Sequence, residues 1–540
     1  MKITRDIAAA IKKEKGISNG RPDQQNGVAT QDGSTPQQPP TDGSQAPAGG
    51  QPAPADGQRT TKNTDGQSGQ PSADGKTRGS GMVQPGLIKA FTTLLEKVSG
   101  TKSTIASLPA GLNPAGGQMP GGQDGPNSGG PGNTSSQVSY FAVNQQKGGN
   151  ETKSDQTFNA TEKDQSAVLV TDSGTLDLSK SKISTSGNTS SQDSSSFVGL
   201  NAALLATSGS KINFSDSTVT TTGSGANGVF ANGTDSSISL TNIIIDATAD
   251  GAHGVMATNG GVLTLKDVDI TTRGGSSAAL ATDRGGGTIT ADGGTVTTTG
   301  MNSPVIYSTG NITVKNGTYS ASGAESAVIE GANMIALFDA TLTSSLEDKW
   351  GVMIYQSMSG DAEGAKGTFT MTGGELANTA AKGPLFYITN STGVISLKGV
   401  IVTVNSGELI NASAGNWGND GSNGGIVDFT ADGQNLSGSI IADKISSVSL
   451  TLKNGSTLKS AVNPTRTAKQ VNLTLDSSSS WNVTADSYLT GLSDPAGISG
   501  TTITNIKGNG YTIYYDSAAS PELGGKTFTL NGGGSLTPLI

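Results

Sequence analysis

The densest group of acidic and basic side chains lies around the single histidine of this 540-residue chain. Carboxylate, imidazole and guanidinium groups are the side chains that acid–base catalysis and calcium binding use. Asp267 and Asp269, however, flank an apolar Val268, so their carboxylates are expected to face water. We therefore predict solvated corner residues here, with no catalytic, cofactor-binding or metal-binding role. The group comprises Asp246, Asp250, His253, Asp267, Asp269, Arg273, Asp283 and Arg284.

The motifs of polysaccharide lyases and hydrolases are not found in the sequence. No Asp-Asp dipeptide occurs, and His253 stands in Gly-Ala-His-Gly rather than in Gly-His-Gly. The absence of cysteine excludes thiol catalysis, disulfides and cysteine-based metal sites. The sequence therefore predicts a protein that is not an enzyme and that uses no cofactor.

Four aromatic residues near the longer segments of the chain form the candidate ligand-binding site. They are Trp350, Tyr355, Tyr387 and Trp417. Aromatic rings combine a large apolar face with a polar tip, and exposed rings of this kind are the usual platform for sugar rings. The alternative is that Trp350 packs against its own loop and that the neighbouring Phe386 belongs to the core.

A hydrophobic doublet recurs through the middle of the chain and indicates the elements that position these residues. Its successive spacings are 35, 26, 26, 24, 26, 23, 24, 33 and 24 residues, and a period in the twenties is typical of stacked repeats. The doublets are Val168-Leu169, Ala203-Leu204, Val229-Phe230, Val255-Met256, Ala279-Leu280, Val305-Ile306, Val328-Ile329, Val352-Met353, Leu385-Phe386 and Leu409-Ile410.

Two more strand-like pieces follow each doublet. One alternates, as in Ile238/Leu240, and one places an apolar residue such as Ile245 before polar residues. Gly and Asn between the pieces permit the positive φ of sharp corners. The pattern predicts an all-β fold, a right-handed parallel β-helix with three short strands per rung and about 12 rungs. An antiparallel sandwich is the alternative, but it predicts tight hairpin signals instead of three strand-like pieces that recur together at one period.

The two long spacings predict loops at 191–196 and 359–366 that project from a corner of the helix. Insertions of this kind often carry the binding face of a solenoid. A tolerated surface insertion is the other interpretation.

The sequence divides into six segments. Apolar residues on one face predict a short amphipathic helix at 1–16 and another at 85–100. Gly, Gln, Pro and Ser predict disorder at 17–84 and a Gly/Pro-rich linker at 101–138. The β-helix is expected at 139–460, with a C-terminal β-helical stem and cap at 461–540.

The charge and hydropathy of the sequence limit the classes of partner that we expect. The formal net charge is −9, and residues 1–100 carry 12 basic against 9 acidic groups, so the remainder is the more acidic part. An acidic body without a basic stripe argues against a nucleic-acid partner. No apolar run is long enough for a transmembrane segment, and the apolar stretch near the start is too short for a signal peptide.

The segment 473–489 resembles the stem of adhesin-type, pertactin-like autotransporter passenger β-helices. It reads Leu-Thr-Leu, a serine run, and then Trp-Asn-Val-Thr-Ala-Asp-Ser-Tyr-Leu. The resemblance covers roughly residues 160–540 and implies an exported rod for adhesion, aggregation or biofilm formation. The chain departs from the family in two features, because neither the membrane barrel nor a signal peptide is visible in the sequence.

We accordingly expect an extracellular or cell-surface rod that acts as an adhesin or as a structural protein of a matrix or biofilm. Its partners would be a host-cell or matrix surface and its glycans, through multivalent contacts, and self-association is a further expectation. Two alternatives stay open. One is a polysaccharide-binding or polysaccharide-degrading β-helix, such as a lyase, a hydrolase or a tailspike-like protein. The other is a secreted effector without a signal peptide.

Overall fold

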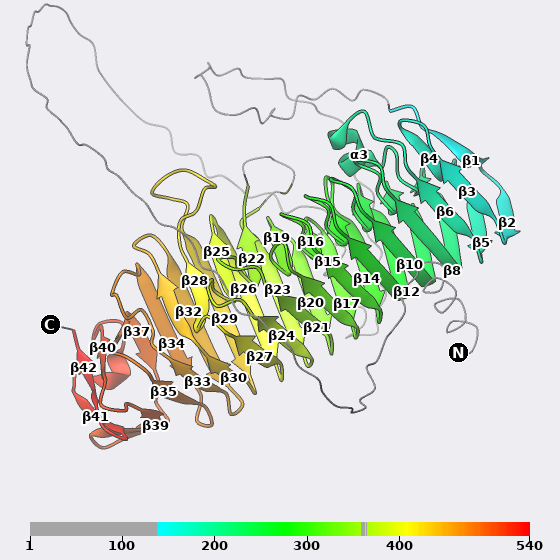
Figure 1. Ribbon diagram of the computed structural model, residues 1–540. Helices are drawn as coiled ribbons and strands as arrows, with labels where there is room; N and C mark the ends of the chain where they lie inside the picture. Colours follow the sequence, from blue (N-terminus) through cyan, green and yellow to red (C-terminus); the bar gives the residue numbers. More distant parts are fainter. Residues whose placement is uncertain (1–137, 358–361, 363, 540) are drawn as a thin grey trace, which may run out of the picture. The chain divides into compact units, whose positions relative to one another are not determined.

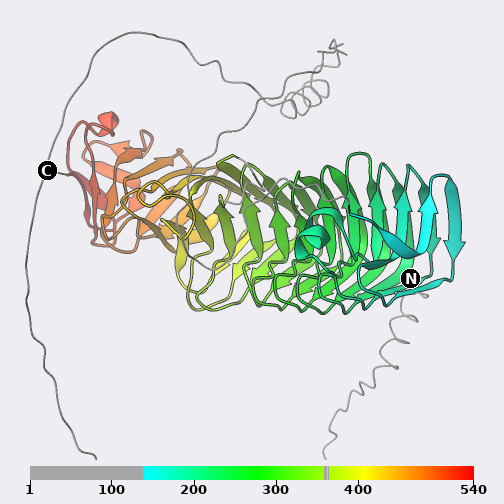
Figure 2. The same cartoon turned by 90° about the horizontal axis from the view of Figure 1, so that it is seen from above.

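The computed structural model describes residues 138–357, 362 and 364–539. These residues form a parallel β-solenoid of about 16 turns with three short strands in most turns (Figures 1 and 2). The predicted all-β parallel solenoid is therefore confirmed. The predictions for 1–16, 17–84 and 85–100, and for the linker up to residue 137, lie outside the described residues.

The first wall of the solenoid is a twelve-stranded parallel sheet with one strand per turn. Its strands lie side by side along the stack (Figure 1). In order they are β1 (Phe141–Lys147), β4 (Gln165–Thr171), β7 (Leu204–Thr207), β9 (Val229–Asn232), β11 (Val255–Thr258), β13 (Leu280–Thr282), β16 (Ile306–Ser308), β19 (Ala327–Glu330), β22 (Val352–Tyr355), β25 (Phe386–Thr389), β28 (Glu408–Ala412) and β31 (Ser439–Ala442).

The second wall follows the first in each turn. Three of its strands continue round the next corner without a break and also supply the third wall: β8 (Lys211–Thr221), β10 (Ser237–Ala247) and β12 (Gly261–Thr272). The others are β2 (Asn150–Ser154), β5 (Thr175–Ser179), β14 (Gly287–Asp292), β17 (Asn311–Lys315), β20 (Met334–Phe338), β23 (Lys366–Thr372), β26 (Ser391–Lys398), β29 (Gly425–Asp432), β32 (Ser447–Lys453), β34 (Gln470–Leu475) and β37 (Gly491–Ser493).

The third wall completes each turn, and the last strands close the C-terminal end. Third-wall strands are β3 (Thr157–Ala160), β6 (Lys182–Thr185), β15 (Thr295–Thr298), β18 (Thr318–Ala321), β21 (Thr341–Ser344), β24 (Glu375–Asn378), β27 (Ile401–Val404), β30 (Asn435–Ser437), β33 (Thr457–Ser460), β35 (Ser480–Val483), β39 (Thr502–Lys507) and β41 (Phe528–Asn531). The remaining elements are α3 (Gln192–Val198), β36 (Ser487–Leu489), β38 (Ile498–Ser499), β40 (Thr512–Tyr515), η1 (Pro521–Leu523) and β42 (Ser535–Pro538).

The register of the first wall corrects several of the predicted doublets by one residue. Val229 pairs with Val255 as predicted, but its partner on the other side is Leu204, so the doublet of β7 is Leu204-Leu205. The same shift gives Leu280-Ala281, Ile306-Tyr307, Phe386-Tyr387 and Ile410-Asn411, whereas Ala327-Val328 is shifted by one residue in the opposite direction. Both neighbours of each doublet are often apolar, so the sequence alone does not fix the register.

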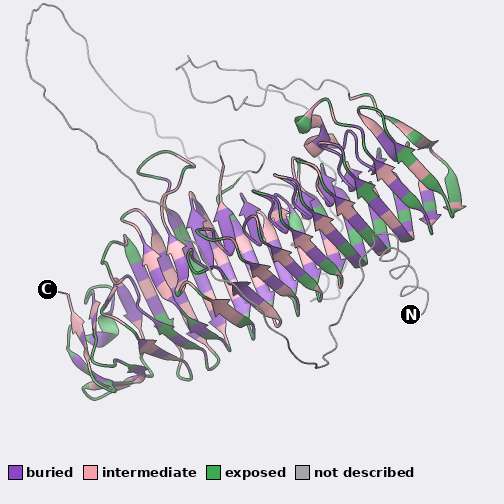
Figure 3. Cartoon of the chain, viewed as in Figure 1, coloured by how far each residue is buried: buried purple, intermediate pink, exposed green. Residues whose placement is uncertain are grey.

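The two residues of each doublet face opposite sides of the first wall. The first residue, such as Val229 or Val255, packs in the central core with the inward residues of the other two walls. The second residue faces outward, into a separate apolar column that we call the outer column. It consists of Leu169, Leu205, Phe230, Met256, Ala281, Tyr307, Val328, Met353 and Tyr387. Burial is therefore high on both faces of this wall, whereas buried and exposed residues alternate along the second wall (Figure 3).

The first predicted loop is instead a helix that covers part of the outer column. In α3, the Ser191 hydroxyl accepts a hydrogen bond from the Ser194 amide, and Gly199 ends the helix at φ 77°. The carbonyl oxygen of Phe197 accepts a hydrogen bond from the Thr258 hydroxyl at the end of β11 (2.9 Å). Since a buried apolar column requires cover, the inserted residues fold as a helix upon it. Most of the second insertion falls outside the described ranges.

The two ends of the stack differ. In β2, Glu151 and Lys153 occupy the inward register positions of Leu176 and Leu178, and they form an ion pair of 2.7 Å. Inward charges of this kind protect a sheet edge from further pairing. At the other end, β41 and β42 pair antiparallel over a buried Leu536.

The count of turns exceeds the prediction, with about 16 turns instead of about 12. The doublet marks only strands of the first wall. Turns beyond residue 460 continue the stack without it, and the first turn contains polar residues at the corresponding positions.

Candidate functional site

The four aromatic residues predicted from the sequence lie together on the outer face of the first wall. Trp350 stacks on Tyr387, with 4.0 Å between ring centroids and 19° between planes. Trp417 and Tyr355 form a tilted pair at 4.9 Å and 57°. All four pack around Val328 and Met353 of the outer column. The structure thus brings residues up to 67 positions apart into one cluster, which we call the aromatic patch.

Strand register explains how the patch is assembled. Val328, Met353 and Tyr387 stand opposite one another on β19, β22 and β25. Tyr355 lies two residues beyond Met353, on the same outer face. The sequence interpretation of Phe386 as a core residue is confirmed, because it is fully buried and packs edge-on against Phe369 and Phe429.

The segment between β28 and β29 holds Trp417 over the patch. The Asn423 amide donates hydrogen bonds to the carbonyl oxygens of Gly415 and Trp417, both at 2.9 Å. A Cβ at position 415 would lie 2.8 Å from the Tyr387 hydroxyl oxygen, so the backbone contacts that ring directly. Only glycine fits this close approach without a shift of its neighbours.

Asp443 anchors the same segment from the following turn. Its carboxylate accepts a hydrogen bond from the Ala414 amide at 2.8 Å. Burial raises the pKa of this carboxyl, but hydrogen bonds from Ala414, Ser446 and Ile445 outweigh burial and hold the pKa below its ordinary value. An ionised Asp443 therefore fixes the start of the Trp417 segment at neutral pH.

Sequence reasoning missed a buried acid at the edge of the patch. Glu330 is 2% exposed, and its Oε2 accepts hydrogen bonds from the hydroxyls of Tyr307 (2.5 Å) and Tyr355 (2.9 Å). Burial, together with the charge of Glu330 and the neighbouring tyrosine, raises the pKa of Tyr307 well above its ordinary value. Burial and the same carboxylate also raise the pKa of Tyr355. Both hydroxyls therefore remain protonated donors to one carboxylate.

A cation lies beside the ring of Trp350. The Lys349 ammonium is 5.0 Å from the ring centroid and 3.4 Å from Glu325, which is 6% exposed. Trp350, Tyr355 and Trp417 are each only partly exposed. A ligand that stacks on Trp350 would therefore displace or contact Lys349.

The acidic and basic group around His253 is spread along the corners of successive turns. Asp246 bonds to Arg273, Asp250 accepts from the Gly275 amide, and Asp269 accepts from the Thr295 amide. Asp267 and Asp269 are exposed, so the prediction that they face water is confirmed. No set of three potential metal ligands lies together in the described part of the chain.

His253 itself is largely enclosed and uncharged. Burial lowers its pKa to about 4, against an opposing hydrogen bond with the Ala278 backbone. Its Nδ1 has no hydrogen-bond partner among the described residues. The imidazole is therefore neutral at neutral pH. The hydrogen bonds of Asp246, Asp250 and Asp269 described above go to other partners.

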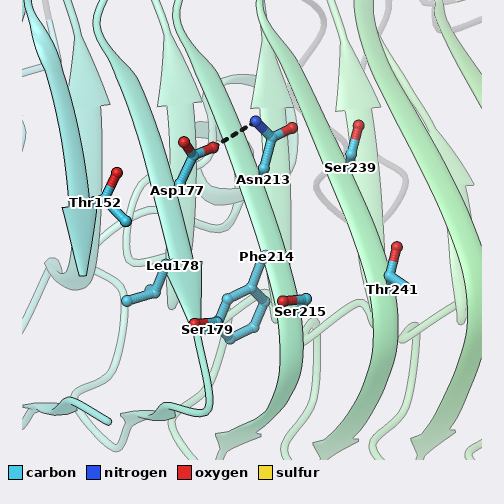
Figure 4. A pocket seen from close by; sticks show the side chains of 9 residues that line it. All are labelled: Thr152, Asp177, Leu178, Ser179, Asn213, Phe214, Ser215, Ser239 and Thr241. Carbon is cyan, nitrogen blue, oxygen red and sulfur yellow. Dashed lines mark hydrogen bonds between the residues drawn. The ribbon is translucent and has the colours of Figure 1, made fainter. Parts of the chain in front are cut away.

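A shallow hollow on the second wall has no comparable chemistry. It measures about 370 Å³ and lies over β2, β5, β8 and β10 (Figure 4). Its one acidic residue, Asp177, accepts a hydrogen bond from the Asn213 amide at 2.7 Å. Hydroxyl groups make up most of the remaining polar lining.

Comparison with protein-family models, with curated proteins and with solved structures finds no match for this chain. Within the described ranges, no helix has the length and apolar character needed to cross a bilayer. Among the described residues, the aromatic patch is the feature that supports a function most directly.

Proposed function

We propose that this protein is a non-catalytic binding protein that attaches to glycans through the aromatic patch on its first wall. The observation that carries the proposal is the convergence of Trp350, Tyr355, Tyr387 and Trp417 on one outer surface. Trp350, Tyr355 and Trp417 are partly exposed, whereas Tyr387 is buried and stacks against Trp350. Partly exposed aromatic faces suit the apolar faces of sugar rings. The stacked turns supply a rigid support, which lowers the entropic cost of binding.

The same proposal places the protein outside the cell, as an adhesin or as a structural protein of a matrix or biofilm. The resemblance of segment 473–489 to passenger stems supports this placement. A chain with few charges and without cysteine fits such a rod. Weak contacts to a host-cell or matrix surface gain strength when many copies bind at once.

Intrinsic fluorescence offers a direct test, because two of the three tryptophans belong to the patch and the third, Trp481, is buried in the stem. Titration of the full chain with a panel of neutral and acidic polysaccharides should change the emission for at least one of them. Trp350→Ala and Trp417→Ala should each lower the affinity by on the order of ten-fold, which corresponds to about 1.4 kcal/mol for the loss of one aromatic face.

Phe338→Ala is the matched control, because this exposed aromatic residue lies on the second wall. It should bind as the unmodified chain does. Binding that survives both tryptophan substitutions, or that Phe338→Ala weakens equally, would show that the patch is not the site. The absence of binding to every member of the panel would reject the proposed function.

Glu330 supports a second candidate function, the hydrolysis of a polysaccharide. Glycosidases employ a pair of carboxyl groups, and Glu330, which accepts hydrogen bonds from two tyrosine hydroxyls, would supply one of them. Its near-complete burial and its two donors favour a structural role instead. Release of reducing ends from any polysaccharide of the panel, abolished by Glu330→Gln, would establish the enzymatic alternative.

A further inference from the structure

The first wall continues beyond β31 into the C-terminal stem. Ile440 of β31 bridges to Val462, and the amide of Tyr488 donates a hydrogen bond to the Val462 carbonyl oxygen (3.0 Å). Tyr488 of β36 then stands opposite Tyr514 of β40. These two tyrosines therefore extend the wall that carries the aromatic patch.

Both tyrosines face outward. Leu489 and Tyr515, the next residues on each strand, are buried in the core, so alternation directs Tyr488 and Tyr514 to the outer face. They are partly exposed, and their rings stack at 4.8 Å with 8° between planes. Trp481 of β35, by contrast, is fully buried in the C-terminal core.

Arg466 is held beside this stack by an unusual backbone conformation. Its φ is 54°, a region that residues with long side chains seldom adopt. Three hydrogen bonds fix the turn. The Arg466 amide donates to the backbone carbonyl of Asn463, and the amides of Thr467 and Ala468 donate to the side-chain oxygen of Asn463. The guanidinium carbon lies 5.7 Å from the Tyr488 ring centroid. We call Arg466, Tyr488 and Tyr514 the stem site.

Cations accompany aromatic rings along this wall. The described residues contain three cation–π contacts, and all lie on this wall or on helix α3 that covers it: Arg284 over Phe197, Lys349 over Trp350 and Arg466 over Tyr488. The chain as a whole is acidic, with a net charge of −9. On the same wall, Glu325 and Glu330 are buried and bonded to protein partners. Among the described residues, the charged groups that lie over aromatic ring faces are therefore positive.

The spacing of the two aromatic sites suits one extended ligand. Along the wall, Tyr387 is followed by Asn411, Ile441 and Asn463 before Tyr488 is reached. Four steps at the usual ~4.8 Å between strands give about 19 Å. Asn411 and Ile441 are both partly exposed along this path.

We infer that the ligand is a linear anionic polysaccharide that lies along the first wall and contacts both the aromatic patch and the stem site. The inference rests on the proposed function, because the patch supplies the first contact. The aromatic rings would stack on sugar faces, and Lys349 and Arg466 would pair with carboxylate or sulfate groups. Two contacts on one chain raise the affinity because the second forms at a high effective concentration.

The test uses the full chain and whichever anionic polysaccharide of the panel binds best, cut into fragments of graded length. For polygalacturonate, the methyl-esterified polymer is the matched neutral ligand. Affinity should rise by on the order of ten-fold or more once a fragment spans about 19 Å. The double substitution Tyr488→Ala/Tyr514→Ala should remove that rise and leave the affinity of short fragments unchanged. Trp350→Ala should lower the affinity for fragments of every length.

Arg466→Gln should lower the affinity for the acidic polymer more than the affinity for its neutral counterpart. Added salt should reduce that difference. Tyr511→Ala and Arg273→Gln are the controls, since the first is an exposed aromatic residue outside the stack and the second is a cation on the third wall. If the affinity does not depend on fragment length, or if the stem-site variants bind as the unmodified chain does, the ligand does not contact the stem site. The proposal for the aromatic patch would still stand. A preference for neutral polymers would overturn the anionic class, and no binding at all would reject both proposals.

Discussion

At the scale of single residues, Glu330 accounts for the fixed geometry of the aromatic patch. A buried carboxylate is stable only when its hydrogen bonds are satisfied, and Tyr307 and Tyr355 donate two of them. The carboxylate in turn fixes where both rings lie. Trp417 then packs against the Tyr355 ring, whose position is already set, while Trp350 stacks on Tyr387.

His253 leads to a prediction at the same scale. Its pKa in the folded protein is about 4, against about 6.5 in an unfolded chain. Between these values the unfolded state binds a proton that the folded state does not, so the free energy of unfolding falls as the pH is lowered from 7 to 5. From about one pH unit above 6.5 upward, the imidazole is neutral in both states and the effect is absent.

Urea unfolding at pH 7 and pH 5 measures this effect. The unfolding midpoint of the unmodified protein should fall more between these pH values than that of His253→Asn. Since the chain has one histidine, its imidazole resonance can be followed without ambiguity by NMR. An imidazole that titrates at its ordinary pKa in the folded protein would contradict the prediction.

At the scale of elements, the corners decide how closely successive turns can stack. A column of residues between the second and third walls adopts positive φ, including Asp216, Asn242, Asp267 and Asn316. Side chains link neighbouring turns there, as in the hydrogen bond from the Asn242 amide to Asp216 (2.9 Å). Asn, Asp and Gly tolerate this conformation, which explains their recurrence between strands.

Substitution of two corner glycines distinguishes the free-energy cost of positive φ from the free-energy cost of steric contact between turns. A Cβ at Gly374, with φ 73°, would lie 2.1 Å from the Ala340 carbonyl oxygen of the preceding turn. Gly455 has φ 77° and open space around its Cβ position. Gly455→Ala should lower the free energy of unfolding by about 1–2 kcal/mol through backbone strain. Gly374→Ala should lower it clearly more, because the turns must move apart.

Urea unfolding followed by circular dichroism provides the comparison for these two variants. Equal losses of stability in Gly374→Ala and Gly455→Ala would mean that the tight contact between turns does not matter.

At the scale of the solenoid, the third wall contains one discontinuity. Among the described strands, β27 pairs with β24 but with no strand of the following turn. Val402 and Val404 face the core yet are partly exposed, whereas the corresponding Leu376 is fully buried. The side chain of Gln434 spans the break, with hydrogen bonds to the backbone N–H and carbonyl of Val400, both at 3.3 Å.

Hydrogen exchange should reveal this discontinuity. Amides of 401–405 should exchange faster than those of 341–345, because fewer ladder bonds and less burial protect them. Gln434→Ala should accelerate exchange at 399–405 and leave 341–345 unchanged. Uniform protection of both segments in the unmodified protein would show that the break has no energetic consequence.

Much of the architecture was predictable because a solenoid repeats its pattern. The alternation of Ile238 and Leu240 identifies a half-buried strand, and glycine pairs such as Gly293-Gly294 identify corners, both at positive φ. Helix α3 was not predictable from such patterns. Its seven residues are mostly polar, and they fold as a helix because an apolar column beneath them requires cover.

The sequence by itself determined the period, the strands and the corners, because side-chain alternation and glycine conformations are local properties of the chain. It also pointed to Trp350, Tyr355, Tyr387 and Trp417. Only the tertiary structure decided that they form one patch, that Glu330 joins them and that Tyr488 lies on the same wall. A register shift of one residue turns a side chain from the core to the outer face, and where both neighbours are apolar only the stacking of whole turns selects the register.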